Sequence, residues 1–479
     1  MSEDIKKNTL KGVKWTAIEK VALQGIQFVI GLILARLLSP SDFGLVGMLA
    51  IFISISQTFV DGGFSNALIR KIDRTDTDCS TAFYFNIVVG LVCYGLLFIA
   101  SPWVADFFNT PILADLLKVL SISIFVNSLA VVQIAKLTVD INFKAQARAT
   151  VCSVILSGCI GIGMAYHGYG VWSLAWQTVF GAIFKCVILW YQTKWKPKAV
   201  FSMDSFCNLF SYGSKLLLSN LIGTFYANMT TIAIGKFYTS KDLGYYSRGQ
   251  QFAHLPSTAI IDTIGRVTFP ILAKIQNDDE RLISVYRKYI KVTSLPILFF
   301  LTLLAAVAKP LIIVLLTEKW LDATLFLQIF CFAFMTEHIS KLNLNLLQIK
   351  GRSDLYLRLE IIKKIIAFGI LMCSIPLGVI VICLSKVLNG QVALFINTYY
   401  TGKLFGLGYL KQFSDFAKYL LLSIISCLPA YMLNYADIPS ILQLGIGVFI
   451  SILLYCFLLR KDCIFIELRE IVSNVIKRK

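Results

Sequence analysis

The chain has 479 residues, of which 57% are apolar and 15% are charged, and its mean hydropathy is +0.74. A soluble domain is about 45–50% apolar and about 25% charged, so this composition excludes an ordinary soluble protein and favours a membrane protein. The net charge of +18 would suggest nucleic-acid binding in a soluble chain, but no stretch is long and polar enough to form a basic module, which excludes that function.

Apolar stretches recur along the chain at the length that a transmembrane helix requires, which is about 20 residues. They predict an all-α membrane protein with about fourteen transmembrane helices. The predicted spans are residues 15–38, 43–68, 82–101, 112–135, 149–166, 171–191, 209–235, 245–270, 291–316, 323–347, 358–377, 379–399, 416–435 and 440–459. The first span is too long for a signal-peptide core, and no small-residue cleavage site follows it, so we expect it to be a permanent span.

Basic residues gather in every second connection between the predicted spans. Lys and Arg are enriched on the cytoplasmic side of membranes. If the N-terminus lies in the cytoplasm, each inner connection carries more basic residues than its outer neighbours. The pattern therefore predicts an even number of spans with both termini in the cytoplasm. The largest inner connection, about residues 271–290, contains a charged run at 278–281 and predicts a short interfacial helix.

Two stretches of the chain, ARLLSPSDFGL at 35–45 and GKFYTSKDLGY at 235–245, read alike. Each has a basic residue, two apolar residues, and then Ser or Thr followed by Asp and Gly at fixed spacing. The Ser/Thr-x-x-Asp spacing favours a cap on the following helix, and two unrelated capping motifs are the alternative interpretation. As a duplication, the stretches predict two parallel lobes of about six helices each. The predicted boundaries are 1–200 for the N-lobe, 201–402 for the C-lobe, and 403–479 for two appended helices and a basic cytoplasmic tail.

Several charged residues fall inside the predicted spans, where a charge costs several kcal/mol unless it faces a cavity or a partner. Their balance is positive, which predicts a water-filled cationic cavity and an anionic ligand such as a phosphate or pyrophosphate group. The predicted substrate-binding cations are Arg248, Lys215, Lys20, Arg266 and Lys341. The predicted polar lining is Gln24, Gln27, Tyr226 and Gln251, and the predicted ion-coupling carboxylates are Asp61 and Asp262.

Each of these residues also has a purely structural interpretation. Asp262 and Arg266 are spaced to form a local ion pair, and lysines near the inner face can extend to water. Arg248 is the strongest single candidate because it lies just inside the outer end of its predicted span. The tyrosines beside it also fit an interfacial aromatic belt.

The sequence contains no motif for ATP hydrolysis. The Gly-Lys pairs at 235–236 and 402–403 are followed by Phe and Leu, so neither is a P-loop. The twelve cysteines form no C-x-x-C pair and only three histidines exist, so we expect no disulfide framework, metal site or cofactor. A membrane-embedded glycan polymerase or ligase would need catalytic residues in a sizeable outer loop, and the predicted outer loops are short. We therefore expect a transporter rather than an enzyme.

Three motifs in the first half of the chain resemble those of bacterial polysaccharide flippases, a family within the larger group of multidrug, oligosaccharidyl-lipid and polysaccharide exporters. They are LSPSDFG at 38–44, DGGFSNALIR at 61–70 and GYGVWSL at 168–174, and the resemblance extends over nearly the whole chain. It implies a protein of the bacterial inner membrane that moves undecaprenyl-pyrophosphate-linked oligosaccharides to the outer leaflet by alternating access. These substrates feed the assembly of lipopolysaccharide, capsule or exopolysaccharide.

The resemblance leaves alternatives open. It implies that the predicted cationic cavity holds the pyrophosphate, that the sugars fill the aqueous space, and that the lipid tail stays among the membrane lipids. A drug exporter of the same fold would favour carboxylates in its cleft, because its substrates are usually cationic. A scaffold that organises a glycan-assembly complex would not require a charged cavity. The expected partners are the lipid-linked substrate and a polysaccharide polymerase, and the expected state is a monomer.

Overall fold

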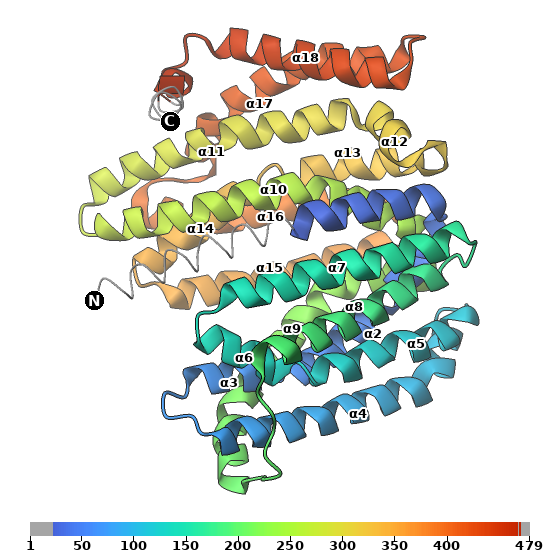
Figure 1. Ribbon diagram of the computed structural model, residues 1–479. Coiled ribbons are helices and arrows are strands. Elements are labelled where there is room, and N and C mark those ends of the chain that lie inside the picture. The colour runs from blue at the N-terminus through green and yellow to red at the C-terminus, as the bar shows by residue number, and fades with distance from the viewer. Residues whose placement is uncertain (1–22, 468, 471–479) are drawn as a thin grey trace. The chain divides into compact units, whose positions relative to one another are not determined.

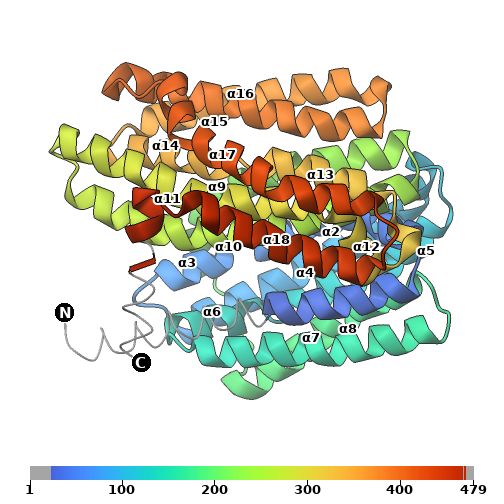
Figure 2. The same cartoon turned by 90° about the horizontal axis from the view of Figure 1, so that it is seen from above.

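The computed structural model describes residues 23–467, 469 and 470, and it describes the side chains in this range except those of residue 256 and residues 258–267. The chain divides into two compact units, Met1–Gly244 and Tyr245–Lys479. Helices and short turns account for the structure of the described residues, so the predicted all-α class is confirmed. Figures 1 and 2 show the two orthogonal views.

Over its described residues, the first unit contains a helix over Leu23–Leu37 and eight further helices. These are α2 (Pro40–Asp61), α3 (Phe64–Arg70), α4 (Asp76–Phe107), α5 (Ile112–Ser128), α6 (Val131–Val139), α7 (Phe143–Tyr166), α8 (Trp172–Thr193) and α9 (Met203–Phe237). Helices α4 and α5 pack side by side, as do α7 and α8 (Figures 1 and 2). Helix α2 packs along α9 and α5, which places the second and seventh predicted spans next to each other.

The second unit is reached through α10 (Ser240–Lys274), whose first residues belong to the first unit. Its further helices are α11 (Asp279–Ala306), α12 (Ala308–Leu316), η1 (Glu318–Trp320), α13 (Ala323–Phe334), α14 (Glu337–Ile349), α15 (Ser353–Ser374), η2 (Ile375–Leu377), α16 (Val379–Phe405), α17 (Tyr409–Met432), η3 (Leu433–Tyr435) and α18 (Ser440–Leu459). Helix α17 packs against α11 and α18, and α16 packs against α13, α14 and α15.

Each predicted span corresponds to a helix or a pair of consecutive helices. Within the described residues, eleven helices are long and apolar enough to cross a membrane. Helices α10 and α15 are not among them, because α10 is too polar and α15 carries Arg358, Glu360, Lys363 and Lys364. The protein is thus a multi-pass membrane protein, and the number fourteen stays a prediction.

Both copies of the repeated motif cap a helix, as the sequence predicts. The Ser39 hydroxyl accepts a hydrogen bond from the Asp42 amide at 3.3 Å, and the Asp42 carboxylate accepts one from the Ser39 amide at 2.8 Å. The same reciprocal pair joins Thr239 and Asp242 at 3.1 and 3.2 Å. Each motif therefore satisfies donors at the start of its own helix without help from other elements.

The second predicted span is broken into α2 and α3 at Gly62 and Gly63. Both glycines have positive φ, 45° and 71°, a region that other residues adopt only with strain. Phe64 then begins α3 in a buried cluster with Leu68 and Phe83, which fixes this short helix against α4 and α6. The break leaves Asp61 as the last residue of α2.

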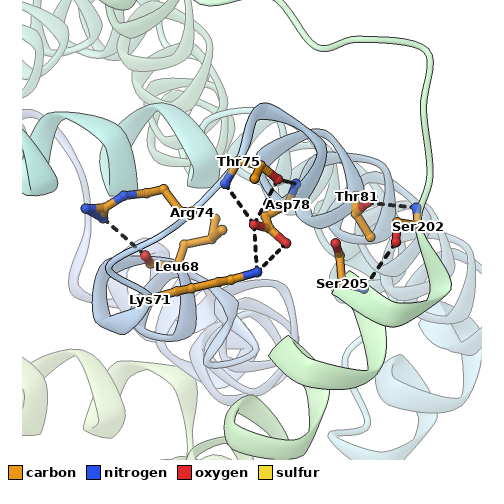
Figure 3. Close-up of polar contacts among 8 residues, drawn as sticks. All are labelled: Leu68, Lys71, Arg74, Thr75, Asp78, Thr81, Ser202 and Ser205. Atoms are coloured by element: carbon orange, nitrogen blue, oxygen red, sulfur yellow. Dashed lines mark hydrogen bonds and ion pairs between the residues drawn. The ribbon is translucent and has the colours of Figure 1, made fainter.

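A buried carboxylate closes the turn from α3 to α4 (Figure 3). The Asp78 side chain is only 1% exposed, and its two oxygens accept hydrogen bonds from the Lys71 ammonium at 2.9 and 2.8 Å. The Thr75 amide and hydroxyl also donate to it, at 2.8 and 3.0 Å. Three residues after Asp78, the Thr81 hydroxyl accepts a hydrogen bond from the Ser202 amide, which holds the segment leading into α9.

Replacing Asp78 with alanine is expected to lower the stability of the protein by about 2–3 kcal/mol, because Lys71 and the Thr75 donors lose a buried acceptor. Thermal unfolding in detergent, followed by the fluorescence of a thiol-reactive or tryptophan probe, measures the change. The matched control is Asp76→Ala in the same turn, since Asp76 is 48% exposed and should matter little. Equal unfolding temperatures for the two variants would remove the assigned role of Asp78.

The charged run at 278–281 does not form the separate interfacial helix that the sequence predicts. Instead of a separate interfacial helix, Asp278 caps α11, and α11 runs without a break from Asp279 into the apolar segment that ends at Ala306. Further along, Arg287 makes two hydrogen bonds of 2.8 Å to the buried Asp415 of α17, and Lys291 lies 3.3 Å from the same carboxylate. The charged end of α11 therefore anchors α17 rather than lying apart on the membrane surface.

Candidate functional site

The first unit contains a cavity of about 1060 Å³ among its apolar helices. Five long helices supply most of its wall, namely α2, α5, α7, α8 and α9, together with the helix over Leu23–Leu37 and the short helices α3 and α6. The polar side chains of the lining are Gln27, Ser54, Gln57, Thr58, Asp61, Ser65, Asn66, Ser123, Asn127, Thr150, Ser153, Thr178, Lys185, Asn220, Thr224 and Asn228. A wall this rich in hydroxyl and amide groups is hydrated and can exchange hydrogen bonds with a polar solute.

A chain of hydrogen bonds runs across the cavity wall from α5 to the end of α2. The Asn127 amide donates to the Gln57 side-chain oxygen at 3.0 Å, and the Gln57 amide donates to the Asp61 carboxylate at 2.9 Å. On the side of α9, the Thr58 and Thr224 hydroxyls lie 3.1 Å apart. These bonds fix the α2 side chains in place and orient the Asp61 carboxylate.

Among the described residues, two charged side chains line this cavity, Asp61 on α2 and Lys185 on α8. They attract each other, yet among the described residues Lys185 forms neither an ion pair nor a hydrogen bond. Asp61 is the last residue of its helix, where the backbone carbonyls present a partial negative charge that disfavours a carboxylate. The site therefore combines a neutral polar wall with one cation and one anion that are each open to a ligand.

The sequence-predicted residues of the first unit meet this cavity only in part. Gln27 and Asp61 line it. Gln24 and Tyr226 are half-buried and Lys215 is exposed, and these three lie outside the lining. Lys20 lies outside the described residues.

The remaining predicted residues belong to the second unit. Arg248 on α10 is 9% exposed, its Nη1 donates to the Gln251 side-chain oxygen at 2.7 Å, and its guanidinium lies 5.9 Å from the centre of the Trp320 ring. Lys341 on α14 pairs with Glu337 at 3.4 Å. The side chains of Asp262 and Arg266 lie outside the described ones.

Sequence reasoning missed Lys185 and the face of α9 that carries Asn220, Thr224 and Asn228. A signal was present for both. Lys185 is a lone charge inside the apolar stretch 171–191, and the α9 residues recur every fourth position, as one helix face requires. A neighbouring stripe that includes Lys215 also has helical spacing, and spacing alone does not say which stripe faces the cavity.

Several known proteins are similar to this chain in sequence or in fold. The family described as "Polysaccharide biosynthesis protein" matches residues 33–325. The teichuronic acid biosynthesis protein TuaB of Bacillus subtilis is 27% identical over 356 residues, which cover 73% of this chain and 73% of TuaB. The lipopolysaccharide biosynthesis protein WzxC of Escherichia coli is 25% identical over 365 residues, which cover 75% of this chain and 73% of WzxC.

The lipid II flippase MurJ, in an inward closed conformation, has a similar fold with a TM-score of 0.74 and 14% sequence identity, covering 93% of this chain and 98% of MurJ. An inward-facing multidrug transporter of the MATE family matches with a TM-score of 0.58 over 82% of this chain and 98% of its own. These likenesses concern the fold alone, whereas the family match spans more than half of the chain. The protein therefore belongs to the polysaccharide biosynthesis protein family, as its resemblance to polysaccharide flippases predicts.

Proposed function

We propose that this protein carries an undecaprenyl-pyrophosphate-linked oligosaccharide from the cytoplasmic to the outer leaflet of the bacterial inner membrane. The observation that carries the proposal is the large cavity of the first unit, with its wall of neutral hydroxyl and amide groups inside a bundle of apolar helices. Its volume of about 1060 Å³ lies at the upper end of the range for small-ligand pockets, about 300–1,000 Å³. An uncharged glycan with many hydroxyl groups suits such a wall.

In this proposal the Lys185 ammonium binds the anionic part of the substrate, and Asp61 binds the coupling ion. A charge-assisted hydrogen bond is about twice as strong as a neutral one, so a single lysine adds both affinity and orientation. The wall around it, made of groups such as Asn127 and Thr224, then contacts the sugars. The lipid tail stays in the bilayer, and the substrate crosses without a chemical reaction, so the protein acts as a transporter and not as an enzyme.

Names of relatives support this choice of substrate. TuaB is named for the biosynthesis of teichuronic acid, WzxC is named for the biosynthesis of lipopolysaccharide, and MurJ is named a lipid II flippase. We propose that this chain works as a monomer, with both termini in the cytoplasm, and delivers its product to a polysaccharide polymerase.

Extraction of the lipid-linked oligosaccharide pool from cells that lack the gene tests the proposal. The expected result is accumulation on the cytoplasmic leaflet together with loss of the surface polysaccharide. An unchanged pool combined with altered sensitivity to cationic drugs would instead identify a drug exporter. An unchanged pool with normal drug sensitivity but less polymer would indicate a scaffold or a polymerase.

Arg248 is the proposed anion-binding residue of the second unit, and the cations Lys20, Lys215, Arg266 and Lys341 and the carboxylate Asp262 are proposals of the same kind. Arg248→Ala is expected to abolish transport while Arg248→Lys retains part of it, because lysine keeps the charge but loses the planar donors that reach Gln251. Surface glycan is measured at matched expression and matched thermal stability. Normal glycan in the alanine variant would remove Arg248 from the site.

A further inference from the structure

The two copies of the repeated motif meet each other in the structure, and all of the residues concerned belong to the unit that ends at Gly244. The Ser41 and Ser240 hydroxyl oxygens lie 2.6 Å apart, although 199 positions separate them. A Cβ atom on Gly44 would lie 1.7 Å from the Ser240 carbonyl oxygen, and one on Gly244 would lie 2.0 Å from the Pro40 carbonyl oxygen. Only glycine permits either approach.

This contact is reciprocal, since the glycine of each copy packs on the backbone at the start of the other copy's helix. A self-complementary contact of this kind is what two copies of one motif make across an approximate twofold axis. We name the contact of Pro40, Ser41 and Gly44 with Ser240 and Gly244 the serine clasp. The serine clasp is not needed to cap either helix, because each motif forms its capping hydrogen bonds within itself.

Helices α2 and α9 pack along each other, and we call their contact the α2–α9 seam. The serine clasp lies where α2 begins and α9 ends, and a second contact of the same kind lies toward the other end of the seam. A Cβ atom on Gly63 would lie 2.5 Å from the Gly213 carbonyl oxygen, and one on Gly213 would lie 2.9 Å from the Gly62 carbonyl oxygen. We name this contact of Gly62, Gly63 and Gly213 the glycine clasp. Between the two clasps, residues 53–61 of α2 and 220–228 of α9 line the cavity.

We propose that the serine clasp and the glycine clasp are the two alternate gates of the α2–α9 seam, and that one or the other opens to give the cavity access from one side. This inference rests on the proposed function, because a carrier must expose its cavity to each side in turn. The distribution of basic residues predicts that the serine clasp faces the outer side.

The chemistry of the serine clasp suits a contact that opens and closes repeatedly. Its contact consists of one hydroxyl–hydroxyl hydrogen bond and backbone van der Waals packing, and the capping boxes at Ser39 and Thr239 keep both helix ends satisfied when it opens. Opening the seam at the glycine clasp also separates Phe64 of α3 from Phe206 and Phe210 of α9. The glycine clasp is therefore supported by apolar side-chain packing as well as by backbone contact.

A reversible cross-link tests the serine clasp. Ser41→Cys and Ser240→Cys are combined in a chain whose twelve native cysteines are replaced. We expect oxidation to form a disulfide in detergent and in liposomes, to stop the movement of lipid-linked oligosaccharide between leaflets, and to be reversed by a reductant. The two single-cysteine variants are the matched controls and should transport with or without oxidant.

Wedging variants test the two clasps separately. Gly44→Ala and Gly213→Ala each add a methyl group that the closed contact cannot hold, while alanine strengthens the helix itself. A reporter cysteine at Thr178 in the cavity wall is labelled with a membrane-impermeant thiol reagent from one side of the membrane at a time. We expect Gly44→Ala to raise labelling from the outer side, and Gly213→Ala from the inner side, by about fivefold or more.

The outcomes separate this inference from the proposed function. No disulfide in the double variant, full transport by the cross-linked protein, or labelling unchanged by both wedges would each overturn the two-gate inference. The clasps could control labelling as expected while the wild-type protein moves no lipid-linked oligosaccharide. That result would support the two gates and show that the proposed substrate is wrong.

Discussion

Replacing Lys185 with methionine is expected to slow transport by about 10- to 100-fold, which corresponds to a loss of about 1.4–2.8 kcal/mol of binding free energy. Methionine preserves the length of the side chain and removes the one positive charge that the described residues contribute to the cavity lining. The folded protein should not suffer, because Lys185 forms no ion pair or hydrogen bond with another described residue. Its thermal stability should stay the same or rise, since a lone charge among membrane helices is costly.

Two further variants serve as controls for Lys185→Met. Lys185→Arg keeps the charge and should retain most of the activity. Lys118→Met removes a half-buried lysine of α5 that lies outside the cavity lining and pairs with Asp115, and it should have no effect. Initial rates are compared at equal protein amounts. Wild-type rates in the methionine variant would exclude Lys185 from substrate binding.

The same variant identifies which anionic group Lys185 binds. Transport is compared for two substrates that share the lipid pyrophosphate, one with neutral sugars only and one with an acidic sugar. Equal loss of rate for both substrates assigns Lys185 to the pyrophosphate, whereas loss for the acidic one alone assigns it to a sugar carboxylate.

Asp61→Asn is expected to abolish the stimulation of transport by an imposed Na⁺ or proton gradient. Asp61 is the one carboxylate that the described residues contribute to the cavity lining, and Gln57 and the end of α2 hold it in place. A bound cation offsets the unfavourable position of this carboxylate at a helix C-terminus, and an asparagine amide has no charge to attract one. Asparagine keeps an oxygen that accepts from Gln57, so the wall should stay intact.

Exchange of substrate between leaflets without a gradient should persist in the Asp61→Asn variant, which separates coupling from binding. Asp106→Asn, at an exposed position near the end of α4, is the control and should respond to the gradient like the wild type. A variant at Asp61 that retains full gradient dependence would show that the ion binds elsewhere.

The sequence predicts the helices of this protein well because their signals are local. The apolar stretches match the observed helices, and the motifs at Ser39 and Thr239 cap α2 and α10 as their spacing requires. The very short link at 167–170 also separates two helices, α7 and α8, with positive φ at Gly168 and Gly170. Each of these features depends on a few neighbouring residues.

The cavity was harder to predict because its wall depends on how helices face one another. Helical spacing correctly groups Gln24 with Gln27, yet only Gln27 reaches the cavity. On α9 the stripe with Asn220 and Thr224 lines it, and the stripe with Lys215 does not. Rotation of a helix about its axis is set by distant packing, such as Gly213 against Gly63, which no local pattern encodes.

The most direct test of the account is the movement of a purified undecaprenyl-pyrophosphate oligosaccharide between the leaflets of liposomes that contain only this protein. Lectin or glycosidase access from outside the liposomes reports the fraction in the outer leaflet over time. The account predicts rapid redistribution by the wild type and a rate about 10- to 100-fold lower for Lys185→Met. Redistribution no faster than in protein-free liposomes, with folded and correctly inserted protein, would contradict it.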